Sequence, residues 1–202
     1  LFISVVATIG TVISSAIVAY GFARFKFKGK KLLFSAMLLS MMLPAQVLMI
    51  PQYLWYQKLN WVGSYMPLIV PYFFAIQGFF VYLISNFISG IPRDLDEAAK
   101  IDGCSYVSIF TKIILPLIMP AITICLFMTT TNAFKMFDLN LALTAGLPGK
   151  STSLVALDIY NSFYNRMGYE GVGQAKAVMF LLIVATISVT QLIITRRKEV
   201  EN

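Results

Sequence analysis

Apolar runs of about 20 residues recur along this 202-residue chain, and they restrict the folds open to it more than any other feature. A helix of about 20 residues covers the roughly 30 Å hydrocarbon core of a bilayer. Hydrophobic residues make up 58% of the chain and charged residues 12%, with a mean hydropathy of +0.78, so a soluble domain would lack polar surface. Buried core helices of a larger soluble protein are the alternative, but those usually have shorter apolar runs. We therefore expect an all-α, polytopic transmembrane helix bundle.

Five membrane spans can be read from the apolar runs, at residues 1–22, 32–50, 66–87, 113–131 and 177–195. Neither an initiator Met nor a basic lead-in precedes Leu1, so we expect the chain to start partway through its protein, with at least one helix upstream. Prolines interrupt several runs, and in a bilayer such breaks survive only where protein or a wet cavity accommodates the freed backbone groups. They fit either a bundle that encloses a path or simple structural kinks: Pro44, Pro71, Pro116 and Pro120.

The basic residues predict the orientation of the spans. Five of them lie between the first two spans with no acid, and three more follow the last span: Arg24, Lys26, Lys28, Lys30, Lys31, Arg196, Arg197 and Lys198. The positive-inside rule places both clusters, and hence the C-terminus, in the cytoplasm. Within a single transmembrane domain over residues 1–202, the segment 88–112 then lies inside and the segments 51–65 and 132–176 lie outside. Within the long outer segment, residues 153–163 are expected to form a helix.

The inner segment 88–112 contains a short amphipathic helix pattern. Pro92 suits a helix start, acids follow where the helix dipole favours them, and Gly103 suits a helix end. Apolar side chains recur at helical spacing between these signals: Leu95, Ala98, Ala99 and Ile101. The pattern predicts a helix of two to three turns on the cytoplasmic face, with small alanines that permit close approach by another protein.

The same segment resembles the EAA signature of ABC importer permeases at every fixed position. Glu97-Ala98-Ala99 is followed after three residues by Gly103, and after nine more by Ile113, one residue, and Leu115-Pro116. The resemblance implies a coupling helix that docks into a cleft of a separate ATPase. Glu97, Ala98, Ala99 and Gly103 would be its docking elements, and Ile113, Leu115 and Pro116 would join it to the fourth span.

The resemblance also implies the surroundings of the chain. It would lie in a bacterial cell membrane, in contact with lipid, beside a second permease subunit. A cytoplasmic ATPase dimer would bind ATP and Mg²⁺, with no cofactor on this chain, and an extracellular or periplasmic solute-binding protein would deliver the substrate.

Flanking stretches resemble carbohydrate permeases of the maltose-transporter type. Residues 20–30, 41–47 and 50–51 look like the second permease subunit of that group. Residues 132–139, 143–144 with Pro148, 159–161 and the tail at 196–200 look more like the first. This implies a sugar or oligosaccharide as the transported solute. Permeases for amino acids, phosphate or polyamines share the EAA loop, and those for glycerol phosphate look similar to the sugar group, so these solutes stay open as alternatives.

Candidate pathway residues combine aromatic rings with amide and charged groups, as sugar recognition requires. Six lie near the outer end of the fourth span and two are polar residues inside apolar spans: Asn132, Phe134, Lys135, Phe137, Asp138, Asn140, Gln46 and Gln77. Each could instead serve packing or hydrogen bonds between helices. Lys135 and Asp138 would pair with each other if they lay on one helix.

The sequence contains no set of catalytic or metal-ligating residues. Histidine is absent, and Cys104 and Cys125 are too far apart to suggest a disulfide or zinc site. Glu97 and Asp102 are better explained as solvated charge than as an acid–base pair. The net charge of +7 is not gathered on a soluble module, so no nucleic acid is expected as a partner. We expect a transport subunit and not an enzyme.

The energy source is expected on another polypeptide. Residues 149–152 (GKST) look like the end of a phosphate-binding loop, but Thr144 occupies the position of its first glycine. A secondary transporter driven by an ion gradient would show ionisable residues at mid-membrane and repeated halves, and neither is seen. A structural or assembly protein of the membrane would not account for the EAA-like segment.

Overall fold

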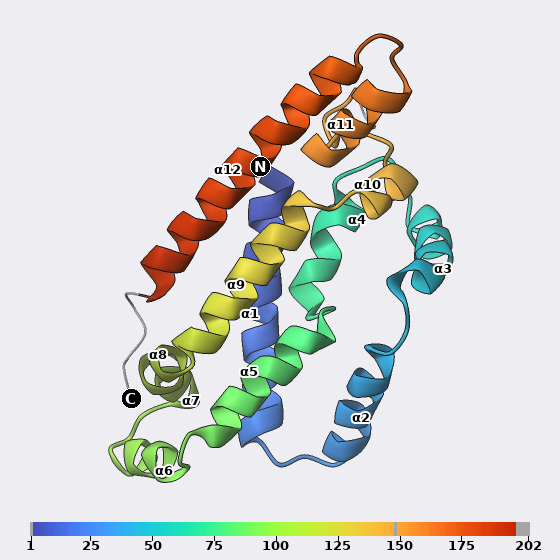
Figure 1. Ribbon diagram of the computed structural model, residues 1–202. Helices are drawn as coiled ribbons and strands as arrows, with labels where there is room; N and C mark the ends of the chain where they lie inside the picture. The colour runs from blue at the N-terminus through green and yellow to red at the C-terminus, as the bar shows by residue number, and fades with distance from the viewer. Residues whose placement is uncertain (1, 148, 197–202) are drawn as a thin grey trace.

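The computed structural model describes residues 2–147 and 149–196, and every regular element within those ranges is helical. Leu1, Pro148 and residues 197–200, which enter the predictions above, lie outside the described residues. The helix α1 (Phe2–Arg24) runs through the middle of an elongated bundle (Figure 1), and α5 (Gly78–Gly90) and α9 (Met119–Phe134) pack against it. The helix α12 (Glu170–Arg196) covers α9. The expectation of an all-α helix bundle is confirmed.

The number of long apolar segments agrees with the five predicted spans. Within the described ranges, three segments are long and apolar enough to cross a membrane: Phe2–Arg24, Met66–Gly90 and Glu170–Arg196. The number rises to five if each of two bent helix pairs is counted as one span. These pairs are Lys30–Ser40 with Ala45–Lys58, and Tyr106–Leu117 with Met119–Phe134.

The chain changes direction with each span (Figure 1). Residues 24–31 and 88–112 therefore lie at one end of the bundle, toward which α12 also descends, and residues 132–176 lie at the other. We call these the α6 end and the α11 end. This arrangement agrees with the predicted alternation of the loops.

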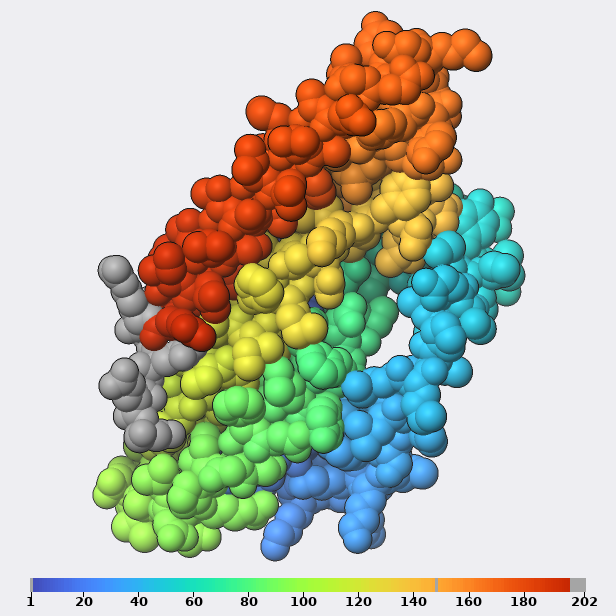
Figure 2. All heavy atoms as spheres, viewed as in Figure 1, coloured from blue at the N-terminus to red at the C-terminus, as the bar shows by residue number. Residues whose placement is uncertain are grey.

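The second predicted span, at 32–50, is sharply bent at the proline inside it. The helices α2 (Lys30–Ser40) and α3 (Ala45–Lys58) meet at 105°. Pro44 has no N–H and disfavours helical backbone at the residue before it, so the chain breaks there and restarts at Ala45. In these two fully described helices, Tyr56 is the one buried residue. Figure 2 shows this α2–α3 arm standing away from the rest of the bundle, with an opening between them.

The third span is also interrupted. Residues of α4 (Met66–Ile69) pass into a 3-10 helix, η1 (Val70–Phe74), and Ala75 adopts a left-handed backbone with φ 51° before α5 starts. Pro71 accounts for the loss of regular α-helical bonding. Ser14 of α1 spans the break, since its Oγ donates to the Tyr72 carbonyl at 3.0 Å and accepts from the Ala75 N–H at 3.1 Å. A neighbouring helix thus satisfies the freed groups, as the bilayer requires.

The fourth span is bent inside its predicted range of 113–131, and its longer helix, α9, begins at Met119. The preceding segment consists of α7 (Tyr106–Ile109), a π-helical turn η2 (Phe110–Ile114) and α8 (Leu115–Leu117), and it is bent by 77° from α9. Pro116 and Pro120 both lack the N–H that a continuous helix needs, so the first is accompanied by a π turn and the second lies in the first turn of α9.

The fifth span is longer than predicted. The helix α12 starts at Glu170, ahead of the predicted start at residue 177, because its polar first turns are helical although they lie outside the apolar run. At the α11 end it packs on α11 (Val155–Tyr164), which confirms the helix expected at 153–163. An ion pair links these two helices, with Lys176 Nζ of α12 lying 2.6 Å from Asp158 Oδ2 of α11.

Two apolar clusters hold the bundle together. The larger one joins α1, α5 and α9 with the segment before α9, and it includes Ile84, Ile88 and Ile114, all fully buried. The smaller one lies at the α11 end around Leu68 and Leu143 and involves α10 (Asp138–Leu143). Close approach of α1 to η1 depends on Gly10, where a β-carbon would lie 2.7 Å from the Phe73 ring.

This contact predicts that Gly10→Val destabilises the bundle. We expect a loss of about 1–3 kcal/mol from overpacking against Phe73, measured as a lower midpoint of thermal unfolding in detergent. Gly21→Val on the same helix is the matched control, since a β-carbon there meets no atom within 4 Å. Equal midpoints for the two variants would contradict the packing described.

Candidate docking helix and candidate pathway cavity

The predicted amphipathic helix is α6 (Asp94–Ile101). Asp94, Asp96 and Glu97 lie in its first turn and Lys100 in its last, each where the helix dipole favours its charge. Gly103 has φ 80°, and the N–H groups after the helix return to its carbonyls: Gly103 to Lys100 at 3.0 Å and Cys104 to Ala99 at 2.9 Å. The predicted helix stop at Gly103 is confirmed.

The helix presents two unlike faces. Asp96 and Ala99 are its buried residues, and Ala99 joins the larger apolar cluster. The opposite face is open, with Glu97, Ala98 and Gly103 exposed. Leu95 and Ile101 retain 43% and 86% of their surface, so the predicted apolar stripe does not pack on the bundle except at Ala99. The outer face of α6 therefore offers small and apolar atoms to another molecule.

A buried ion pair attaches α6 to α1. Arg24 Nε lies 2.8 Å from Asp96 Oδ2, and the two side chains are only 6% and 10% exposed. The other two guanidinium nitrogens donate to the Ile91 carbonyl, both at 3.1 Å. Removing one partner of such a pair leaves a buried charge and costs about 3–5 kcal/mol.

The sequence predictions miss this pair, because Arg24 counts there as a topology signal and Asp96 as a helix-dipole acid. The helical spacing offered one signal that Asp96 is buried. Asp96 lies three residues before Ala99 and therefore on the same face of the helix, whereas Glu97 lies two residues before it and faces elsewhere.

The remaining residues of the EAA-like segment lie between α6 and α9. Ile113 is in the π turn and Leu115 and Pro116 are in α8. Ile113 and Leu115 pack partly buried against the larger apolar cluster. The structure places these residues between the short helix and α9, as predicted.

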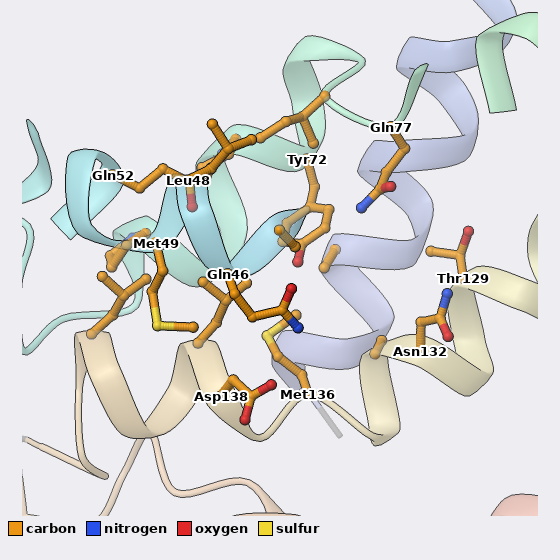
Figure 3. Close-up of a pocket in the computed structure, with 18 of the residues that line it drawn as sticks. Gln46, Leu48, Met49, Gln52, Tyr72, Gln77, Thr129, Asn132, Met136 and Asp138 are labelled. Carbon is orange, nitrogen blue, oxygen red and sulfur yellow. The ribbon is translucent and has the colours of Figure 1, made fainter. Parts of the chain in front are cut away.

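A cavity of about 690 Å³ lies between the α2–α3 arm and the bundle. It brings together six of the eight candidate pathway residues, from four separate parts of the chain. Figure 3 shows Gln46, Gln77, Asn132 and Asp138 around the same space. The six that line the cavity are Gln46, Gln77, Asn132, Lys135, Phe137 and Asp138.

Further polar groups line this cavity that the sequence does not single out. Gln52 of α3, Tyr72 of η1 and Thr129 of α9 add an amide and two hydroxyl groups (Figure 3). In the sequence, Gln52 and Tyr72 are distinguished only by following a proline, at 51 and 71, which marks a place where a helix can be interrupted. Apolar side chains such as Met49 and Phe79 fill the spaces between. Hydrogen-bonding groups beside apolar and aromatic surfaces suit a polar ligand with apolar ring faces.

Two candidate pathway residues do not line the cavity. Phe134 packs against Phe180 of α12, with ring centroids 6.3 Å apart. Asn140 is fully buried, and its amide donates to Thr144 Oγ1 and the Thr152 carbonyl, both at 2.8 Å, and accepts from the Leu154 N–H at 3.0 Å. Asn140 thus fixes the turn that contains the GKST stretch.

The expected pairing of Lys135 with Asp138 is also wrong. Lys135 caps the end of α9 and Asp138 begins α10, so they do not share a helix. Across residues 2–147 and 149–196 the ion pairs are Arg24–Asp96 and Lys176–Asp158. Both charges of the cavity are therefore available to a ligand.

The sequence has a defined family. Residues 10–200 match the family described as binding-protein-dependent transport system inner membrane component. This chain belongs to that family. The resemblance drawn from the EAA-like segment is confirmed, and the chain is one of the membrane components of such transport systems.

Several relatives are permease proteins for saccharides. The chain is 40% identical over 151 residues to the probable starch degradation products transport system permease protein AmyD of Thermoanaerobacterium thermosulfurigenes, covering 71% of this chain and 51% of that one. It is 33% identical over 195 residues to the polygalacturonan/rhamnogalacturonan transport system permease protein YtcP of Bacillus subtilis, covering 93% and 67%. For the trehalose/maltose permease protein MalF of Thermococcus litoralis, identity is 31% with coverage of 68% and 47%. The chain spans about half the length of most of these relatives.

Solved structures agree with the fold. A bacterial alginate ABC transporter, in complex with a periplasmic protein bound to alginate pentasaccharide, contains a chain that superposes with a TM-score of 0.77 at 18% identity, over 98% of this chain and 76% of that one. A second structure, of a bacterial ABC transporter involved in alginate import, gives 0.71 at 20% identity, over 96% and 71%. The chain thus shares the fold of a chain in these bacterial ABC transporters.

The bonds of Asn140 predict that Asn140→Ala destabilises the α11 end. We expect a loss of about 2–3 kcal/mol, because three hydrogen bonds vanish and the Leu154 N–H is left buried without its acceptor. Limited proteolysis in detergent should show faster cleavage between residues 144 and 155. Asn161→Ala is the matched control, since its amide oxygen accepts an exposed hydrogen bond from Asn165 and not a buried one. Unchanged cleavage in Asn140→Ala would contradict the assignment.

Proposed function

We propose that this chain is a transmembrane subunit of an ATP-driven ABC importer for a sugar or oligosaccharide, and that a separate ATPase docks on α6. The observation that carries the proposal is α6 itself. It matches the EAA signature, and the docking elements Glu97, Ala98 and Gly103 face away from the bundle. Family membership supports the same reading.

The open face of α6 supports a protein partner. Leu95 and Ile101 are apolar and exposed, and Ala98 between them is small enough for a partner surface to approach closely. The basic residues of the loop after α1 lie at the same end and indicate the cytoplasm. ATP and Mg²⁺ would bind to the docked ATPase, and this chain would carry no cofactor.

The α2–α3 arm supports a second permease subunit. Its helices are apolar yet bury almost nothing within the described residues, and the cavity lies beside them. A second subunit would close the cavity into a path, with lipid covering the outer helices. In this assembly, residues 1–202 act as one permease domain of a bacterial cell membrane, the C-terminus is cytoplasmic, and a solute-binding protein docks at the α11 end.

The cavity supports a sugar as substrate. Amide groups of Gln46, Gln52, Gln77 and Asn132 can exchange hydrogen bonds with hydroxyl groups, and Tyr72 and Phe137 offer ring faces. One Lys and one Asp in the lining balance each other, which favours an uncharged solute over an anionic one. The relatives named for starch products and for trehalose/maltose point to the same class.

Charge reversal at Glu97 tests the docking site. We expect Glu97→Lys to lower both ATPase co-purification and uptake by at least tenfold while membrane insertion is unchanged, because Glu97 is exposed on the open face of α6. Glu170→Lys is the matched control, an exposed acid in the first turn of α12 at the opposite end. Gly103→Pro should likewise abolish coupled uptake, since proline cannot adopt φ 80°. Normal uptake and ATPase stimulation in both α6 variants would refute the docking role.

Removal of a cavity amide tests the pathway. Asn132→Ala should raise the KM for uptake of the transported sugar about tenfold, equivalent to the loss of about 1–1.5 kcal/mol of hydrogen bonding, without lowering ATPase binding. Phe134→Leu is the comparison variant, because Phe134 lies two residues after Asn132 but packs on α12. A KM that changes for Phe134→Leu and not for Asn132→Ala would exclude the cavity as the path.

A further inference from the structure

We propose that the buried Arg24–Asp96 ion pair positions the coupling helix, locking α6 to the end of α1 so that the two move as one body. This inference rests on the proposed function, because it concerns how motion at α6 reaches the rest of the subunit. The argument follows from what else holds α6 in place.

Few other contacts attach α6 to the bundle. Of its eight residues, only Asp96 and Ala99 are buried, and Ala99 contributes a single methyl group. Arg93 Nη2 donates to the Ala23 carbonyl at a long 3.4 Å. Lys100 lies 5.1 Å from the ring centre of Tyr106, but both side chains are exposed. The ion pair is therefore the strongest cross-link between α6 and α1.

Arg24 makes this link rigid because it engages two segments at once. Its Nε faces Asp96 in the first turn of α6, and its terminal nitrogens both reach the Ile91 carbonyl at the end of α5. A planar guanidinium held on one side by Asp96 and on the other by the Ile91 carbonyl has less freedom to rotate than a single-point contact would leave it. The helix dipoles favour both charges as well, since Arg24 ends α1 and Asp96 begins α6.

The helix α1 extends from this pair to the cavity. Ten residues before Arg24, Ser14 bonds both sides of the break in the third span, and Gly10 packs on Phe73. The broken segment supplies Tyr72 and Gln77 to the cavity wall. A displacement of α6 that is passed to α1 through Arg24 would therefore reach the cavity lining directly.

Distance measurements test the rigid link independently of transport. Nitroxide labels at Lys26→Cys and Ile101→Cys, in a Cys104→Ser background, place one probe after α1 and one on the open end of α6, on side chains that the fold leaves exposed. In nanodiscs we expect one narrow distance distribution, which broadens when Asp96→Asn is added. Asp158→Asn, which breaks the half-exposed pair with Lys176, should leave it narrow. An unchanged distribution in Asp96→Asn would overturn the proposal.

Hydrolysis and uptake by the reconstituted complex test the consequence. We expect Asp96→Asn to keep ATPase binding and basal hydrolysis within twofold, and to lose at least tenfold in solute-stimulated hydrolysis and uptake. The double variant Arg24→Asp/Asp96→Arg should restore at least half of the stimulation. Arg24→Lys should retain part of it, because lysine keeps the positive charge but cannot reach Asp96 and the Ile91 carbonyl together as the guanidinium does. Full stimulation in Asp96→Asn would overturn the positioning role. Absence of ATPase binding by the unaltered subunit would instead refute the proposed function.

Discussion

The need to satisfy every backbone group inside a bilayer shapes this molecule more than any other constraint. Prolines interrupt the apolar helices at several points, and each removes a hydrogen-bond donor where no bulk water can replace it. At the break near Ala75 a neighbouring helix replaces the lost hydrogen bonds. Ser14 of α1 donates to the Tyr72 carbonyl before the break and accepts from the Ala75 N–H after it. Helix interruptions are thus stable only where another helix lies against them or where a wet cavity adjoins.

The sequence predicted what depends on composition and local signals. Run length indicated five apolar segments, charge placement indicated which loops share an end, and Gly103 marked the end of the docking helix. It could not predict where the prolines bend the chain. Pro44 and Pro120 start new helices at large angles, whereas Pro51 lies inside α3 without ending it, so the residue type alone does not decide the outcome.

Contacts between distant segments were harder still. Gln46 and Gln77 reach one cavity with Asn132 because three separate breaks turn their helices toward it, and the polarity of these residues was the only clue. Asn140, an equally polar residue in the same stretch, turns inward to fix a loop. The partner of Asp96 lies 72 positions earlier in the chain, so a pattern confined to the EAA-like segment could not reveal it.

The two candidate sites lie at different depths of one structure that α1 connects. At one end Arg24 holds the docking helix, and near the middle Ser14 and Gly10 hold the broken wall of the cavity. The membership of the chain in a family of transport-system membrane components fits this arrangement of an exposed docking face and a polar cavity in one bundle.

Contact between α6 and an ATPase is the central claim, and cross-linking from the open face of α6 tests it most directly. A cysteine at position 98, with Cys104 replaced by serine, would be joined in intact membranes by a short thiol-reactive cross-linker, with position 161 at the α11 end as the comparison site. The account predicts an adduct with the ATPase from position 98 and none from position 161. If position 98 formed no such adduct and was instead labelled by an impermeant reagent added outside the cell, the account would be contradicted.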